Sequence, residues 1–232
     1  MPADFDEPGY VLHARPYRET SLLLELFVRD SGRIGAVARG LRSARAQPLR
    51  AALQPLQPLQ LTLRAGGELA LLRAAEPTAS PLALHGTALL AAFYVNELLV
   101  RLLPRQAPAP ELFWRYAACL GDLEQGADVG WRLRRFERDL LDALGYGLIL
   151  EHDAAGEPIE PGARYRYEPD LGLVPDDDPT GVLGADLLLL ATDAATLPRD
   201  PAALRRMLRQ ALQPHLGGRE LRSWGLLREL PG

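Results

Sequence analysis

The chain contains no lysine, and all 26 of its basic residues are arginine. It has a single cysteine, Cys119, which excludes an internal disulfide and a zinc site built from several cysteines. No apolar run reaches the roughly 18 residues that a transmembrane helix needs. The first ten residues also lack the basic and apolar segments of a secretory signal peptide. These absences predict a cytoplasmic protein with no membrane partner.

The motifs of common enzymes are missing as well. The four histidines are scattered, and no GxSxG, HExxH or phosphate-binding glycine loop occurs. Only Asp176–Asp178 offers adjacent carboxylates for a divalent cation, as a metal-dependent nuclease would need. An acidic triplet beside prolines is more typical of a solvated loop. Cys119 has apolar neighbours and is expected to be a small core residue. We therefore expect no enzyme, no metal site and no cofactor.

Short strands with tight turns are expected in the first part of the chain. Residues 21–28 alternate in polarity, so that every second side chain faces the same way. A turn at residues 30–32 leads into a second alternating run, in which Ile34, Ala36 and Ala38 point inward. Two more strands meet at Gly66 and Gly67, and a first strand precedes residue 17. Five such strands predict an OB-fold barrel over residues 1–78, although an SH3-like barrel would give a similar pattern.

The pattern becomes helical after the prolines at 77 and 81. Helical periodicity with proline or glycine at the ends predicts helices near residues 88–103, 110–123, 131–144, 201–213 and 219–230. Residues 151–180 form an acidic, loop-rich insert, with a possible short hairpin in YRYEPDLGL. The predicted fold class is α+β multidomain, with the OB-fold barrel followed by an all-α domain over residues 79–232.

Charge is segregated along the chain, although the formal net charge is only −4. Residues 15–50 hold eight arginines against three acids, a local balance of +5. Residues 151–178 hold nine acids against two arginines, a balance of −7. A basic N-terminal domain indicates either a solvated surface without a partner or a surface for a polyanion.

The basic segment has the features of a DNA-binding surface. Arg33 and Arg39 share one face of a strand, and the arginines that follow lie in a stretch that Gly40 and Pro48 should keep mobile. Guanidinium groups bind phosphate through two hydrogen bonds and stay charged. Tyr17 could stack on a base. With few aromatic rings, phosphate contacts would dominate, which predicts little sequence preference and steep salt sensitivity. The predicted DNA-binding residues are Arg15, Tyr17, Arg18, Arg33, Arg39, Arg42, Arg45 and Arg50.

Six stretches between about residue 8 and residue 228 carry a resemblance to a known family. They are HARPYRETSLLLELFVRDSGRIGAVARGLR, LQPLQPLQL, FYVNELLVRLLP, LRRFERDLLDALGYG, YRYEPDLGL and PHLGGRELRS. In this order and in register, they resemble the RecO family of bacterial DNA repair and recombination mediators. The resemblance implies an N-terminal OB-fold and a C-terminal helical domain without catalytic activity.

The resemblance also implies partners. Members bind single- and double-stranded DNA, anneal complementary strands, and act with RecR at the nucleoid. Together they load RecA onto strands coated by the single-stranded DNA-binding protein, SSB. Some members carry a four-cysteine zinc motif in the helical domain; this chain has GEPIEPGARYRYEPD in that region, so zinc is not expected.

The family docks the acidic, apolar-ended C-terminal tail of SSB, which requires an apolar slot rimmed by cations. The helix LRRFERDLLDAL matches that site, although its leucines could equally be ordinary core and Arg134 could pair with Glu137. Trp224 departs from what the family pattern leads us to expect after RELRS. The candidate SSB-tail residues are Arg134, Leu140, Leu144, Arg219 and Arg222. The main alternative function is a protein-binding adaptor whose basic barrel contacts an acidic protein.

Overall fold

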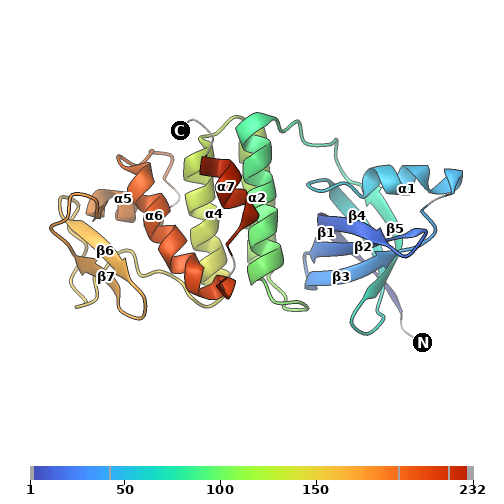
Figure 1. Cartoon of the computed structure of the whole chain (residues 1–232), viewed down its shortest axis with the longest axis horizontal. Coiled ribbons are helices and arrows are strands. Elements are labelled where there is room, and N and C mark those ends of the chain that lie inside the picture. Colours follow the sequence, from blue (N-terminus) through green and yellow to red (C-terminus); the bar gives the residue numbers. More distant parts are fainter. Residues whose placement is uncertain (1–2, 42, 193, 219, 229–232) are drawn as a thin grey trace.

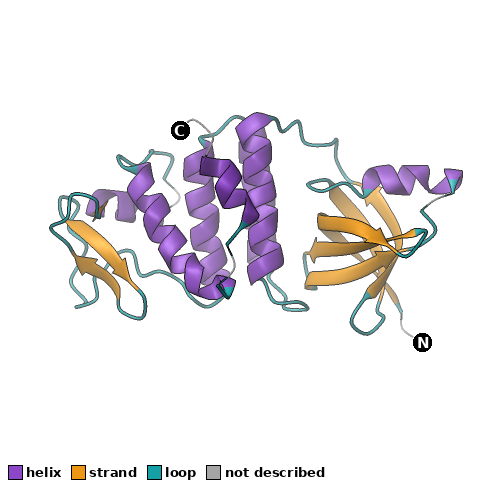
Figure 2. Ribbon diagram, viewed as in Figure 1, coloured by secondary structure: helices purple, strands orange, loops and turns teal. Residues whose placement is uncertain are grey.

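The computed structural model describes residues 3–41, 43–192, 194–218 and 220–228. It has a β-barrel at one end, helices in the middle and a small sheet at the other end (Figures 1 and 2). Two predicted site residues, Arg42 and Arg219, lie outside the described residues. None of the helices in the described ranges is long and apolar enough to cross a membrane.

The N-terminal part is a closed five-stranded barrel with the strand order β1-β2-β3-β5-β4, as the sequence predicted. Neighbouring strands are antiparallel except for β3 and β5, which run parallel. The strands are β1 (Asp4–Tyr17), β2 (Ser21–Val28), β3 (Gly32–Ala38), β4 (Pro58–Arg64) and β5 (Ala70–Pro77). A domain boundary after residue 78 stays a prediction.

The barrel core consists of the alternating apolar residues that the sequence singled out. Leu24 and Leu26 of β2 are fully buried in it, as is Ala36 of β3, and Ile34 of β3 is buried as well. Phe27 follows Leu26 directly in sequence but belongs to the core of the helical part. Successive side chains of a strand point to opposite faces, so β2 joins two cores.

The segment between β3 and β4 differs from the mobile loop that was expected. It contains a short 3-10 helix, η1 (Ala44–Ala46), and helix α1 (Gln47–Ala52). Pro48 lies in the first turn of α1, where a missing N–H breaks no helical hydrogen bond. Ala52 and Leu53 are buried in the barrel core, so this helix packs against the barrel.

The C-terminal part is mainly helical. α2 ends before Pro104 and α3 begins at Pro110, as predicted. The helix α5 was not predicted, because its run of four leucines shows no helical period. The helices are α2 (Gly86–Leu102), α3 (Pro110–Glu124), α4 (Val129–Ala143), α5 (Gly184–Ala191), α6 (Pro201–Leu212), the 3-10 helix η2 (Gln213–Leu216) and α7 (Arg222–Arg228).

The expectation of an all-α domain was wrong in one respect, because this part also holds a small sheet with the order β7-β6-β8. The predicted hairpin is present as β6 (Arg164–Glu168) and β7 (Gly172–Pro175). A third short strand, β8 (Val182–Leu183), pairs with β6 and leads directly into α5. Two residues are too few to show an alternating pattern, which is why β8 was missed.

Hydrogen bonds and apolar packing hold the acidic insert together. The carboxylate Oδ1 of Asp153 accepts the backbone N–H groups of Ala155 and Glu157, each at 2.9 Å. The hydroxyl of Tyr165 accepts the N–H of Glu160 at 2.9 Å. These bonds stabilise the turns of the insert. The buried apolar residues beneath them are Ile159, Tyr165, Leu173 and Val182.

Aromatic rings and one amide connect the barrel to the helices. The ring centroid of Tyr10, on β1, lies 5.0 Å from that of Tyr116, on α3, and Phe27 of β2 contacts the same tyrosine at 5.9 Å. The side-chain amide of Asn96, on α2, donates to the carbonyl oxygen of Leu12 at 3.0 Å and accepts from the Tyr116 hydroxyl at 2.7 Å. The outer face of β1 and β2 is therefore part of the helical core.

Candidate nucleic-acid interface

The strand register places several predicted DNA-binding residues at one end of the barrel. Tyr17, the last residue of β1, is opposite Ser21, the first residue of β2. Leu22 is opposite Ala38, the last residue of β3. The β1–β2 turn therefore lies beside the end of β3, where Arg39 follows.

The segment that carries η1 and α1 is attached to the same end. The backbone N–H of Leu41 donates to the carbonyl oxygen of Thr20, in the β1–β2 turn, at 2.8 Å. The Nη1 atom of Arg50 donates to the carbonyl oxygen of Leu41 at 3.1 Å. Arg50 of α1 is thus held near the turn, and Ala46, the neighbour of Arg45 in η1, packs partly buried against the barrel core. The segment is therefore not an independent loop, and α1 lies beside the barrel (Figure 1).

The arginines of this end are exposed and carry no neutralising carboxylate. Within the described ranges, none of them forms an ion pair, and Glu19 in the β1–β2 turn is the acid closest to them in sequence. Such a cluster gives a positive local potential on a protein that is acidic in total. We call it the arginine end; its members are Arg15, Arg18, Arg39, Arg45 and Arg50.

Tyr17 is half-buried, and one of its neighbours already covers part of it. The guanidinium carbon of Arg18 lies 5.2 Å from the centroid of the Tyr17 ring, a cation–π contact. Arg18 itself has a positive φ of 54°, as expected in a tight turn. A base that stacks on Tyr17 would have to displace this guanidinium or use what remains of the ring.

Arg33 lies elsewhere than the sequence suggested. Its Nη1 atom is 2.9 Å from the Oε2 atom of Glu25, and its Nε donates to the carbonyl oxygen of Leu103, after α2, at 2.7 Å. Glu25 also pairs with Arg105. Burial lowers the pKa of the Arg33 guanidinium, and Glu25 partly offsets this. The sequence predicted that Arg33 shares a strand face with Arg39, but β3 ends at Ala38, and the position of Arg33 at the joint between barrel and helices takes it out of the arginine end.

One arginine near the arginine end was overlooked in the sequence. Leu72 of β5 is paired with Ala38, the last residue of β3, and Arg73 follows Leu72 just as Arg39 follows Ala38. Arg73 is exposed. Only the parallel pairing of two strands that are distant in sequence brings Arg39 and Arg73 near each other, so a local charge count could not include it.

The candidate SSB-tail residues on α4 are mostly buried. Arg134 is 6% exposed and its Nη2 atom lies 2.5 Å from the Oε1 atom of Glu137, the pairing considered from the sequence. The hydroxyl of Tyr94 donates to the same carboxylate oxygen at 2.5 Å. Leu140 is fully buried, and Leu144 packs partly buried against the same core. Neither leucine offers an open slot in this structure.

A small cavity of about 140 Å³ lies next to Arg134. Burial raises the pKa of Glu137 at its base, and the Oε2 atom of that carboxyl has no hydrogen-bond partner among the described residues. Trp224 forms one wall, and the guanidinium carbon of Arg209 lies 3.9 Å from the centroid of its ring. We call this the arginine cavity; it is lined by Tyr94, Arg134, Glu137, Arg205, Arg206, Arg209 and Trp224.

Helix α7 brings Trp224 to this cavity because Glu97 fixes its start. The Glu97 carboxylate accepts the N–H groups of Arg222 and Ser223, each at 2.9 Å, and the Ser223 hydroxyl at 2.5 Å. The side chain of Arg222 is exposed. Glu97 thus caps the helix with its charge on the favourable, N-terminal side.

The residues weighed for catalysis have structural roles. Burial raises the pKa of the Cys119 thiol to about 12, so it is an unreactive core residue. Asp176 and Asp178 each accept a backbone N–H two residues further on, which stabilises the loop. The described residues contain no group of three or more His, Cys, Asp and Glu side chains that could hold a metal ion.

Comparison with known proteins gives a consistent result over both halves of the chain. Residues 1–81 match the family model "Recombination protein O N terminal", and residues 84–225 match "Recombination protein O C terminal". A protein of Xanthomonas campestris pv. campestris is 50% identical over 231 residues, which cover 97% of this chain and 96% of the relative. Relatives from Xanthomonas oryzae pv. oryzae and Stenotrophomonas maltophilia are each 46% identical, with 97% of this chain covered and 96% and 97% of the relatives. All three are named "DNA repair protein RecO".

Proposed function

Because the chain belongs to the RecO family of DNA repair and recombination proteins, we propose that its arginine end binds single-stranded DNA and anneals complementary strands. Members of this family are non-enzymatic recombination mediators, so the function of the chain must come from binding alone. The observation that carries the proposal is the exposure of five arginines at one barrel end without an ion pair among the described residues.

Annealing follows from charge and from what the surface leaves uncovered. Two strands repel each other through their phosphates, and guanidinium groups between them reduce that repulsion. Tyr17 is the only aromatic residue of the predicted interface, and Arg18 partly covers it. Weak stacking leaves the Watson–Crick edges of the bases available for pairing. Base pairing then supplies the driving force, and no nucleotide hydrolysis is needed.

Salt dependence separates this function from the alternative adaptor. If about four phosphates are neutralised, log K for single strands should fall with log[salt] with a slope of about −3, and duplex DNA should give a steeper slope. The experiment is a fluorescence anisotropy titration of a labelled oligonucleotide at 50, 100 and 200 mM NaCl. Failure to bind the oligonucleotide at 50 mM NaCl would refute DNA binding and favour an acidic protein partner for the barrel.

The arginine cavity is the best candidate on the helical part for the SSB tail. An acidic tail with an apolar end requires cations beside an apolar wall, and Arg205, Arg206 and Trp224 provide them at this cavity. This revises the site expected from the sequence, because Leu140 is fully buried while α6 and α7 line the opening. Docking there would bring the arginine end to SSB-coated strands, where the protein acts with RecR so that RecA can load.

Tail binding can be measured with a synthetic peptide of the SSB C-terminus. Arg205→Glu reverses one exposed charge at the cavity and should weaken the peptide about tenfold. Arg199→Glu changes an exposed arginine that does not line the cavity and serves as the matched control. Equal affinity of the two variants would move the tail site away from the arginine cavity.

A further inference from the structure

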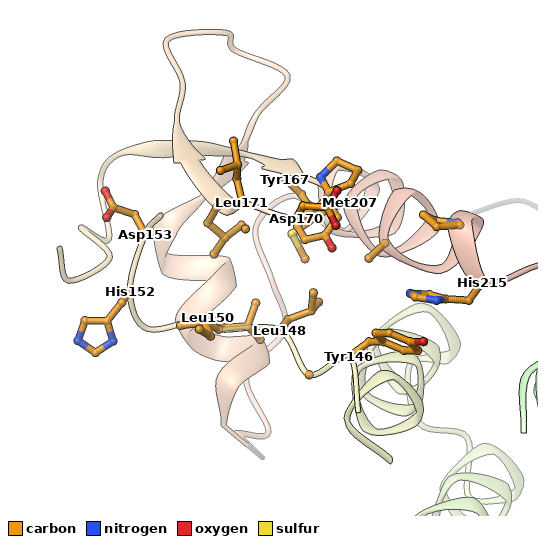
Figure 3. Close-up of a pocket in the computed structure, with 17 residues that line it drawn as sticks. Tyr146, Leu148, Leu150, His152, Asp153, Tyr167, Asp170, Leu171, Met207 and His215 are labelled. Atoms are coloured by element: carbon orange, nitrogen blue, oxygen red, sulfur yellow. The ribbon is translucent and has the colours of Figure 1, made fainter. Parts of the chain in front are cut away.

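A second, larger opening lies on the far side of α6 from the arginine cavity. It has a volume of about 430 Å³ and runs between the loop after α4, the β6–β7 hairpin and one face of α6 and η2 (Figure 3). Met207 and Ala211 of α6 face this groove, whereas Arg205 and Arg209 of the same helix face the arginine cavity. The helical period of α6 thus separates two openings of different chemistry. We call this opening the acidic groove.

The acidic groove exposes large apolar side chains to solvent. Tyr146 is 54% exposed, Ile149 71% and Leu171 63%, and all three line the groove. They come from two separate segments of the chain, so their meeting is a property of the fold. The Tyr146 ring is stacked on the ring of His215 of η2, with centroids 3.9 Å apart, and the pair forms one end of the groove in Figure 3. Contiguous apolar exposure of this kind marks a binding surface more often than single exposed residues do.

The charge of the groove is negative. Asp153 and Asp170 line it, and no arginine is among the described residues of its walls. The surrounding residues 151–178 contain nine acids and two arginines. Both of these arginines are engaged elsewhere, since Arg164 donates to the carbonyl oxygen of Gly181 at 2.6 Å and Arg166 pairs with Glu168 at 2.6 Å. A polynucleotide or an acidic tail would be repelled here.

We propose that the acidic groove binds a segment of a partner protein that carries an arginine or lysine next to apolar side chains. The apolar side chains of the segment would pack on Leu148, Ile149 and Leu171, and its cation would lie near the carboxylate of Asp170. The groove extends in Figure 3 from the Tyr146 and His215 end to the Asp153 end, which suits an extended chain segment. The volume of the groove is within the range found for ligand-binding sites. This site is independent of the arginine end, so DNA binding and groove binding can fail separately.

The test uses a random dodecapeptide display library as the probe. The full chain should enrich peptides that combine a basic residue with leucine, phenylalanine or a similar side chain, and the best peptide is then made and titrated by fluorescence anisotropy. Leu171→Asp should weaken this peptide more than about tenfold. Asp170→Asn should weaken it about three- to tenfold. Asparagine tolerates the positive φ of 67° at this position, so the backbone is not strained.

Two variants outside the groove are the matched controls. Leu197→Asp changes a leucine that is 52% exposed, and Asp177→Asn neutralises an exposed loop aspartate. Both should bind the peptide like the unchanged protein, and circular dichroism should show the same helix content in all four variants. Three outcomes would overturn the proposal. The library could enrich acidic peptides, or it could enrich no peptide more strongly on the unchanged protein than on the Leu171→Asp variant. The control variants could also lose as much peptide affinity as the groove variants. A dimer in sedimentation velocity that Leu171→Asp abolishes would also overturn it, because a second copy of this chain would then occupy the groove.

Discussion

The Nη1 atom of Arg33 lies 2.9 Å from the Oε2 atom of Glu25, and this pair is placed where the barrel meets the helices. The two side chains are only 15% and 14% exposed. Arg33 therefore stabilises the joint and is not available to a phosphate. This separates Arg33 from Arg39, six residues later on the same barrel, which is exposed at the arginine end.

Arg33→Ala should lower stability and leave DNA binding unchanged. Removal of the guanidinium leaves Glu25 and the Leu103 carbonyl without this partner, which costs about 1–3 kcal/mol in the free energy of unfolding. Urea unfolding measures this loss. The salt slope of oligonucleotide binding, measured on the folded variant, should equal that of the unchanged protein. A reduced slope would place Arg33 in the DNA interface after all.

Arg39→Ala should leave stability nearly unchanged and weaken DNA binding. The side chain is exposed and has no ion pair among the described residues, so its removal should change the free energy of unfolding by less than about 0.5 kcal/mol. The magnitude of the salt slope on single-stranded DNA should fall by about 0.7, the value for one phosphate contact. Arg199→Ala, an exposed arginine on the segment before α6, is the control and should leave the slope unaltered.

The contrast between Arg33 and Arg39 shows how far the sequence could define the site. The period of two in β3 correctly predicted the barrel core of Ile34 and Ala36. It could not show that the chain after α2 returns to cover Arg33 but leaves Arg39 uncovered. Arg73 was missed for the same reason, because parallel pairing of β3 and β5 joins residues that are distant in sequence.

The helical part shows the same limit. Proline and glycine at helix ends predicted the bounds of α2, α3 and α4 to within a few residues, because proline and glycine act on local backbone geometry. The arginine cavity forms where α2, α4, α6 and α7 come together, and its residues are up to 130 positions apart, from Tyr94 to Trp224. No local pattern could have shown that Trp224 lies against Arg209.

Asn96 should contribute strongly to the attachment of the barrel. Asn96→Ala removes the donor to the Leu12 carbonyl and the acceptor for the Tyr116 hydroxyl, all of them buried. We expect the free energy of unfolding to fall by about 2–3 kcal/mol in urea titrations. Tyr116→Phe removes only the second bond and should cost about 1 kcal/mol. If Asn96→Ala lowered the free energy of unfolding by no more than Tyr116→Phe does, the hydrogen bond from Asn96 to β1 would have no role in joining the two parts.

The cap of α7 by Glu97 should weaken in acid. Burial alone would raise the pKa of Glu97, but hydrogen bonds from Ser223 and the N–H of Arg222 outweigh it and lower the pKa below its ordinary value. A carboxyl whose pKa is lowered by folding stabilises the protein above its unfolded pKa, about 4.3, and this contribution is lost as the pH falls through the folded value.

Comparison with Glu97→Gln measures this contribution. The variant should be less stable than the unchanged protein by about 1 kcal/mol at pH 7, a modest value because solvent screens this partly exposed site. The difference should shrink when urea unfolding is repeated at pH 4 and pH 3. A difference that stays constant with pH would show that the charge of Glu97 does not matter for the cap.

The most direct test of the account is strand annealing by the variant Arg18→Ala/Arg39→Ala/Arg45→Ala. Complementary labelled oligonucleotides are mixed at 50 mM NaCl, and the rate of duplex formation is followed by fluorescence with the unchanged protein, the triple variant and an Arg199→Ala control. Loss of about three phosphate contacts should reduce the rate acceleration more than about tenfold in the triple variant alone. Annealing at the unchanged rate by a folded triple variant would contradict the claim that the arginine end is where DNA binds.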